Sequence, residues 1–244
     1  GEFFNAWTKS RDFYKETVRN TEGSVREYLF YENFANMRIP IPTVAEQQKI
    51  AEILETCDRM IERKQSKIDE LKKLKQVCLL EMFPQKGQTI PKRRFPGFST
   101  PWEQRKFSDL VETRRGLTYK PTDIREKGVR VLRSSNIDED RFVLKPDDVF
   151  VDESAINIDF AKENDILITA ANGASRLVGK HAIVSEISDK STVHGGFMLL
   201  GTSDEPYFAN AFMSSAWYKR FIDLYVSGGN GAIGNLNKSD LDDQ

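Results

Sequence analysis

Two glycine-rich stretches of this chain could bind a nucleotide or a phosphate. Gly229, Gly231 and Gly234 match the dinucleotide-binding fingerprint letter for letter, yet the polar segment 235–244 follows where that motif needs an apolar helix. Residues 173–180 resemble a phosphate-binding loop, but five residues instead of four separate the glycines, and His181 replaces the magnesium-binding Ser or Thr. We interpret both matches as coincidences.

Other reactive residue types lack the spacing that catalysis needs. His181 and His194 have no cysteine nearby and no metal-ligand spacing, so we expect strand residues and no bound metal. Pro146 and Asp147 could begin a nuclease site, but no acidic residue followed two positions later by lysine occurs downstream. The Asn- or Asp-Pro-Pro-aromatic motif of adenine methyltransferases is also absent. The residues therefore favour a binding protein over an enzyme.

Polar and basic side chains concentrate in loops, where they could contact nucleic acid. Lysine and arginine suit phosphate oxygens, whereas Arg, Asn, Gln, Ser and Thr can read base edges in the major groove. Loops on a rigid scaffold commonly carry binding residues, although each loop could equally be a solvated turn. The candidate DNA-binding residues form four groups: Arg114, Arg115, Thr118 and Lys120; Arg133, Ser134 and Asn136; Asn172, Ser175, Arg176 and Lys180; and Asn230 and Asn235.

Charge is distributed unevenly, although the net charge is only -1. Residues 84–120 contain nine basic and three acidic side chains, whereas residues 138–165 contain ten acidic and three basic ones. Any nucleic-acid contact must therefore be one-sided. A solvated basic linker is the alternative interpretation for Lys92, Arg93 and Arg94.

The segments expected to position the loops are short β-rich runs and one helical run. Strands are predicted at 129–133, 165–171, 177–187 and 192–200, separated by polar and glycine-rich turns. Residues 205–226 are predicted to form a helix that buries Phe208, Phe212, Phe221 and Tyr225 along one stripe. The fold class is therefore α+β, with a mixed α/β domain that follows a long helix.

That long helix is predicted at 46–82. Pro40 and Pro42 prevent an earlier start, and Thr43 with Glu46 fits a capping box. Heptad positions form an apolar seam that Lys64 and Lys75 interrupt. At 1.5 Å per residue the helix is roughly 55 Å long, which predicts a coiled-coil spacer or an ordinary dimerisation arm. The predicted interface residues are Ile50, Leu54, Cys57, Ile61, Ile68, Leu71, Cys78 and Met82.

Overall composition sets weaker bounds. The chain has 244 residues, 39% apolar and 30% charged, as is typical of folded globular protein. No secretory signal or membrane span is visible, which predicts a cytoplasmic protein without membrane contact. Cys57 and Cys78 lie three heptads apart, roughly 32 Å by helix rise, so they cannot form a disulfide within the chain. We expect both to behave as small apolar core residues.

The start of the long helix resembles a conserved region of a known family. Ile-Pro-Ile-Pro-Thr at 39–43, Glu-Gln-Gln-Lys-Ile-Ala at 46–51 and Leu54 are similar to the specificity subunits of type I restriction-modification systems. The resemblance implies four segments: the C-terminal part of a first target recognition domain (1–38), a conserved coiled-coil spacer helix (39–83), a linker (84–101) and a second target recognition domain (102–244). Most of a first domain and a second spacer helix are missing, so we expect a truncated subunit or a fragment.

The resemblance also implies a function. Such a subunit is non-catalytic, reads half of a bipartite double-stranded DNA target and docks methyltransferase (modification) subunits and restriction subunits. No cofactor is expected in this chain, because S-adenosylmethionine, ATP and magnesium belong to the partner subunits. The unpaired seam predicts a homodimer through the spacer helix. The alternative is a coiled-coil scaffold protein with a protein-binding globular domain, and neither the DNA target nor its spacing can be predicted.

Overall fold

The computed structural model describes residues 2–23, 26–226 and 234–244 and divides into two compact units at Leu74. Its α-helices are α1 (Glu2–Trp7), α2 (Arg11–Asn20), α3 (Tyr31–Ala35), α4 (Val44–Met82), α5 (Pro206–Met213), α6 (Ala216–Val226) and α7 (Lys238–Asp242). Its 3-10 helices are η1 (Phe107–Asp109), η2 (Pro121–Asp123), η3 (Ser134–Asn136), η4 (Glu153–Ala155) and η5 (Ser175–Leu177). None of the described helices is both long and apolar enough to cross a membrane.

The long helix α4 begins where its capping residues predict. Thr43 Oγ1 accepts a hydrogen bond from the Glu46 backbone N–H at 3.4 Å, and the Gln47 side-chain amide donates to the Pro42 carbonyl at 2.8 Å. These contacts satisfy two polar groups that a helix start would otherwise leave to water. The predicted helix is therefore confirmed, with the start moved from residue 46 to Val44.

The apolar seam of α4 is exposed in this chain. Leu54, Ile61, Ile68 and Leu71 have exposed fractions of 44%, 65%, 45% and 52%, and Cys57 is exposed and free. Other seam positions, Ile50, Cys78 and Met82, are half-buried. An exposed stripe of large apolar side chains needs a partner surface to be buried.

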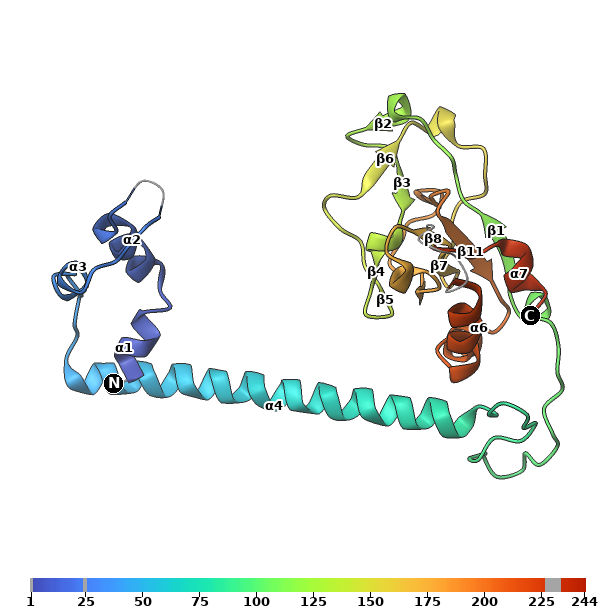
Figure 1. Ribbon diagram of the computed structural model, residues 1–244, viewed down its shortest axis with the longest axis horizontal. Helices are drawn as coiled ribbons and strands as arrows, with labels where there is room; N and C mark the ends of the chain where they lie inside the picture. The colour runs from blue at the N-terminus through green and yellow to red at the C-terminus, as the bar shows by residue number, and fades with distance from the viewer. Residues whose placement is uncertain (1, 24–25, 227–233) are drawn as a thin grey trace. The chain divides into compact units, whose positions relative to one another are not determined.

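The strands of the second unit form two four-stranded sheets and two small ribbons (Figure 1). Their bounds are β1 (Glu112–Arg115), β2 (Ile124–Arg125), β3 (Val129–Leu132), β4 (Ile137–Asp138), β5 (Arg141–Phe142), β6 (Val149–Val151), β7 (Ile166–Thr169), β8 (Ala171–Asn172), β9 (His181–Ile183), β10 (Thr192–His194), β11 (Met198–Thr202) and β12 (Gly234–Asn235). One sheet has the antiparallel order β1-β11-β7-β9. The other has the order β10-β3-β6-β2, with β10 parallel to β3. The ribbons are β4-β5 and β12-β8, both antiparallel.

Three predicted elements are interrupted in the structure. The predicted strand 192–200 is two strands, β10 and β11, separated by a turn. The run 177–187 contains only the short strand β9, and the predicted helix 205–226 breaks into α5 and α6 at residues 214–215. On these helices Phe221 is buried as predicted, Phe212 is partly buried and Phe208 is 44% exposed, while the Tyr225 side chain lies outside the described residues.

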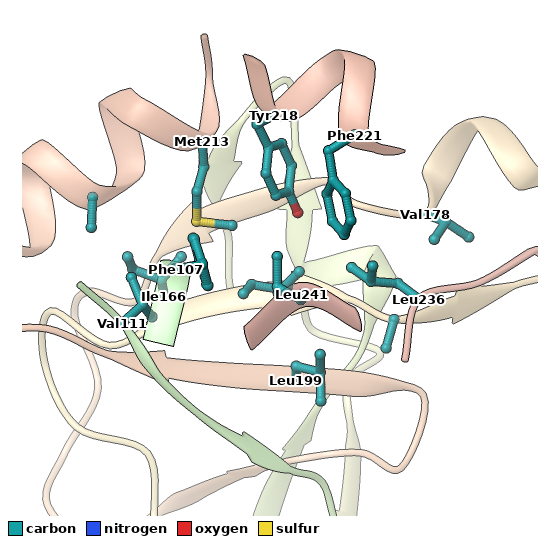
Figure 2. Packing of buried hydrophobic residues seen from close by; sticks show 13 residues of the cluster. Phe107, Val111, Ile166, Val178, Leu199, Met213, Tyr218, Phe221, Leu236 and Leu241 are labelled. Atoms are coloured by element: carbon teal, nitrogen blue, oxygen red, sulfur yellow. The ribbon is translucent and has the colours of Figure 1, made fainter. Parts of the chain in front are cut away.

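The largest core lies between these helices and the first sheet. Figure 2 shows Met213, Tyr218 and Phe221 pointing toward the strand residues Ile166 and Leu199. The Tyr218 hydroxyl donates to the Gly179 carbonyl at 3.0 Å, and burial raises the Tyr218 pKa. In Figure 1, α6 and α7 lie beside the sheet that contains β1, β7 and β11. This core holds the first sheet rigid, and the loops at its end are therefore held as well.

The C-terminal end of α4, from Lys75 on, belongs to the second unit and is followed by an aromatic cluster within it. The ring of Phe83 lies 5.9 Å from the ring of Trp102 and 5.9 Å from that of Phe208. Glu81 forms ion pairs of 2.7 Å with both Lys92 and Arg93, and the Lys92 hydrogen bond is the main reason why the Glu81 pKa is lowered. Of the basic run Lys92, Arg93 and Arg94, the first two are therefore paired with a carboxylate.

Candidate nucleic-acid interface

A tight turn between β10 and β11 organises the candidate interface. We call residues 195–198 the glycine turn, because it contains Gly195 and Gly196 followed by Phe197. The Met198 N–H donates to the Gly195 carbonyl at 2.8 Å, which closes the turn. Three of the predicted loops contact this turn through backbone hydrogen bonds or close packing, and the fourth is joined to the third.

The first loop, which follows β1, packs directly on the glycine turn. The Leu117 N–H donates to the His194 carbonyl at 2.7 Å, and Leu117 forms an isolated bridge with Gly195. A Cβ atom at Gly116 would lie 2.1 Å from the Gly195 carbonyl oxygen, and one at Gly196 would lie 3.1 Å from Thr118 Oγ1. Side chains at these two glycines would therefore separate the loop from the turn.

The second, third and fourth loops are joined to one another. The Gly195 N–H donates at 2.9 Å to the carbonyl of Leu132, the residue before the second loop. The side-chain amide of Asn172, in the third loop, donates to Ser134 Oγ at 3.0 Å. The fourth loop joins the third because β12 pairs with β8, with Asn235 opposite Ala171. Residues from sequence segments far apart therefore share one end of the domain.

Two predicted side chains have structural partners instead of a free surface. Asn136 is fully buried, and its amide donates to the Val143 carbonyl at 3.0 Å and to Asp148 at 2.7 Å while its oxygen accepts from the Arg133 N–H at 2.8 Å. The prediction that Asn136 contacts DNA is therefore corrected: the amide has no free donor or acceptor facing solvent.

Arg114 is the other predicted residue with an internal role. Its guanidinium donates to Asp165 Oδ2 at 2.7 Å and to Thr202 Oγ1 at 2.8 Å. The Asp165 side chain is only 2% exposed, whereas that of Arg114 is 28% exposed. This ion pair links β1 to the strands beside it, because a buried carboxylate needs a paired charge, and the DNA contact of Arg114 stays a prediction.

The remaining described residues are exposed or half-buried. Of these, Asn172 donates to Ser134 Oγ and its oxygen accepts from the Ala174 N–H at 2.9 Å. Arg115, Arg133 and Arg176 are exposed, and among the described residues none of the three has a carboxylate within ion-pair distance. Arg115 lies opposite Leu199 in the sheet, two residues beyond Phe197. The others are placed as follows: Thr118, Lys120, Ser175 and Asn235 are exposed, and Ser134, Asn172 and Lys180 are half-buried. Asn230 lies outside the described residues.

The most exposed apolar side chain near these loops was not predicted. Phe197 is 74% exposed, although its carbonyl accepts hydrogen bonds from the N–H groups of Ala170 at 2.9 Å and Ala171 at 3.0 Å. The sequence prediction missed it because 192–200 was taken as one continuous strand. The signal that could have found it is the pair Gly195-Gly196, which favours a turn.

Both histidines are strand residues, as predicted, and both are buried. Burial lowers the pKa of His194 to about 4, although its Nε2–H donates to the Arg114 carbonyl at 3.1 Å. Burial also lowers the pKa of His181, whose ring contacts the Asn210 amide at 2.8 Å. Within the described part of the chain, no group of three His, Cys, Asp or Glu side chains could hold a metal ion. Their neutral rings serve packing and hydrogen bonding.

Comparison with known proteins identifies relatives of this chain. Residues 8–73 match the family model described as the type I restriction modification DNA specificity domain. The chain is 27% identical over 120 residues to the type I restriction enzyme MjaVIII specificity subunit of Methanocaldococcus jannaschii, a match that covers 48% of this chain and 28% of that protein. Both findings confirm the resemblance that begins at Ile39.

Solved structures share the fold. One similar chain belongs to a structure that describes complex assembly and conformational transition of the type I R-M system. It has a TM-score of 0.54 and 15% sequence identity, and the match covers 100% of this chain and 55% of that one. Another is the S subunit of the type I restriction-modification system from M. genitalium, with a TM-score of 0.50, 12% identity and coverage of 96% and 59%. The α+β fold class is thereby confirmed. The chain spans less than two thirds of the length of each relative.

Proposed function

We propose that this chain, a relative of the type I restriction-modification specificity subunits, recognises a specific sequence in double-stranded DNA. The observation that supports the proposal best is the convergence of three separate loops at the glycine turn, with the fourth loop joined to the third. Arg115, Arg133 and Arg176 supply exposed positive charge on these loops, which also carry the hydroxyl of Ser134 and the amide of Asn172. Guanidinium groups suit phosphates and guanine, and amides suit adenine, so this mixture can both hold and read a duplex.

The chain's part in a larger complex follows as a further proposal. Residues 102–244 read one half of a bipartite target, and the chain docks modification subunits and, with them, restriction subunits. The chain itself makes and breaks no covalent bond and holds no cofactor, while partner subunits use S-adenosylmethionine, ATP and magnesium. Such a complex acts on cellular DNA, which places the chain in the cytoplasm.

The exposed seam of α4 supports a proposed homodimer through the spacer helix. A glutamate in place of Ile61, which is 65% exposed, would put charge into the seam and should shift sedimentation toward monomer. Gln76 is exposed on the same helix and lies outside the seam, so Gln76→Glu is the matched control and should leave the association unchanged. Equal sedimentation of both variants and the wild type would contradict dimerisation through α4.

Selection from a random duplex library tests DNA recognition directly. The purified chain is incubated with the library at about 150 mM salt, with and without a modification subunit, and retained DNA is sequenced. Enrichment of one short motif, or of two motifs at fixed spacing, is expected. Retention without a motif would mean backbone binding only, and no retention in either condition would favour the scaffold alternative.

The exposed arginines allow a sharper test of the interface. Replacing Arg115 and Arg176 together by alanine should weaken binding and reduce the slope of log affinity against log salt by about two, because each arginine neutralises about one phosphate. The control is Arg105→Ala, since Arg105 is exposed but pairs with Glu103 at 2.7 Å. An unchanged affinity and salt slope in the double variant would refute this interface.

A further inference from the structure

Phe197 is exposed to a degree that packing within the domain does not explain. Of the large apolar side chains between residues 103 and 205, only Ile124, Leu144 and Phe197 are exposed, at 47%, 38% and 74%. Single exposed apolar residues are normal on a protein surface, so exposure by itself is not enough to assign a role. The backbone around the ring supplies the second observation.

The fold holds the backbone of Phe197 from several directions at once. Its carbonyl accepts two N–H donors from the third loop, and the turn before it is held by hydrogen bonds to the first loop and to Leu132. A Cβ atom at Gly195 would lie 3.2 Å from Val131 Cγ1, so little room exists for this segment to shift. The backbone that carries the ring is therefore ordered before any ligand binds, which lowers the entropy cost of a contact.

Phe197 also belongs to the turn that the first and third loops contact. Glycines precede it, so Phe197 carries the only large side chain at the tip of the turn. Thr118 lies against Gly196 on one side, and the strand β8, which ends at Asn172, is joined to the Phe197 carbonyl on the other. A duplex that contacts Thr118 and Asn172 together would therefore lie close to the turn that carries Phe197.

We infer that Phe197 makes an apolar contact with a thymine 5-methyl group in the major groove and so helps to select the DNA sequence, an inference that rests on the proposed function. A phenyl ring has no charge and no hydrogen-bonding group, so it cannot hold a phosphate or pair with a base edge. In the major groove the thymine methyl is the apolar group that distinguishes one base pair from the others. The polar side chains of the loops that contact this turn are of the types that read that same groove.

The test compares the wild-type chain with Phe197→Ala on the duplex that the wild type selects. Each thymine of the motif is replaced in turn by uracil, which removes only the methyl group. For the wild type, one uracil position should weaken binding roughly 5-fold to 30-fold, as expected for one lost base contact. Phe197→Ala should lose affinity for the thymine duplex to a similar extent and should be insensitive to uracil at that position.

Controls separate this inference from the proposed function. Phe95→Ala removes another exposed ring, 66% exposed, and should bind like the wild type. Phe197→Ala should keep its melting temperature, its affinity for unrelated duplex and its salt slope, because the ring is not in the core and carries no charge. A wild type that selects no motif refutes both proposals. Three outcomes would refute only the role of Phe197. They are selection of a motif without thymine, an affinity of Phe197→Ala for the motif equal to that of the wild type, and a loss of affinity that is equally large on unrelated DNA.

Discussion

Two neighbouring arginines on β1 should have separable roles in stability and in DNA binding. Arg114→Gln removes the charge that faces Asp165, whose side chain is 2% exposed. Removing one partner of a buried ion pair lowers the free energy of unfolding by about 3 to 5 kcal/mol. Asp165 keeps the Thr202 hydroxyl at 2.7 Å and the Lys162 N–H at 2.9 Å, so we expect the lower end, about 3 kcal/mol. For a domain of this size that corresponds to a fall in melting temperature of roughly 6 to 12 °C.

Arg115→Gln is the matched control, because Arg115 is exposed and the next residue in the same strand. Its free energy of unfolding should stay within about 0.5 kcal/mol of the wild type, while its affinity for duplex DNA falls. Thermal unfolding followed by circular dichroism measures stability, and a DNA titration well below both melting temperatures measures binding. If Arg114→Gln kept the wild-type melting temperature and lost DNA affinity as Arg115→Gln does, the structural role given to Arg114 would be wrong.

Three further predictions concern stability, each measured by urea unfolding. Burial lowers the His194 pKa to about 4, so the unfolded chain binds a proton at this histidine before the folded chain does as the pH falls. The free energy of unfolding should therefore drop by up to about 3 kcal/mol between pH 6.5 and 4. His194→Gln should weaken that pH dependence. Phe83→Ala should cost about 3 kcal/mol by opening the aromatic cluster, whereas exposed Phe95→Ala should cost less than about 0.5 kcal/mol. Gly201→Ala should cost about 1 to 3 kcal/mol because its Cβ would lie 2.5 Å from Val111 Cγ1, and in combination with Val111→Ala the two costs should not add.

The long helix was predictable because its signals are local. Pro42, Thr43 and Glu46 lie within one turn of the observed start, and the heptad pattern continues to the observed end at Met82. Cap residues and apolar periodicity act over a few positions, so a single sequence contains them completely. The heptad pattern does not show which surface covers the apolar seam. Cys57, one of the seam residues, is exposed in this chain.

The strands of the second unit were harder to predict because their ends depend on distant contacts. The run 192–200 is apolar enough for one strand, yet it breaks at the glycine turn, where Leu117, Leu132 and Ala170 supply hydrogen-bond partners from elsewhere in the chain. Similarly, polarity alone made Asn136 a candidate for DNA contact, whereas Asp148 and the Val143 carbonyl hold it in the interior. Side-chain type indicates what a group can bind, and only the fold decides which partner it has.

Counting acidic residues overestimates the negative charge exposed to solvent, because a turn that recurs in the sequence engages aspartate side chains. In four Lys-x-x-Asp segments, the aspartate accepts a hydrogen bond from the N–H of the lysine three residues earlier; these aspartates are Asp109, Asp123, Asp148 and Asp165. Asp148 and Asp165 are buried and pair with Arg130 and Arg114. The acidic segment 138–165 therefore presents less charge to solvent than its composition suggests. The spacing was readable in the sequence and predicts the turn through ordinary aspartate chemistry.

The way in which the loops are held suggests how such a domain could change its target. Backbone groups make most of the contacts at the glycine turn: the carbonyls of Leu132 and Phe197 and the N–H groups of Leu117 and Ala170. Backbone hydrogen bonds do not depend on which side chain a residue carries. The exposed side chains at Arg115, Arg133 and Arg176 could therefore be exchanged with little cost in stability, since surface substitutions away from the core usually change stability by about 0.5 kcal/mol or less. Specificity and folding would then rest on different atoms of the same loops, with the ion-paired Arg114 and the buried Asn136 contributing to folding.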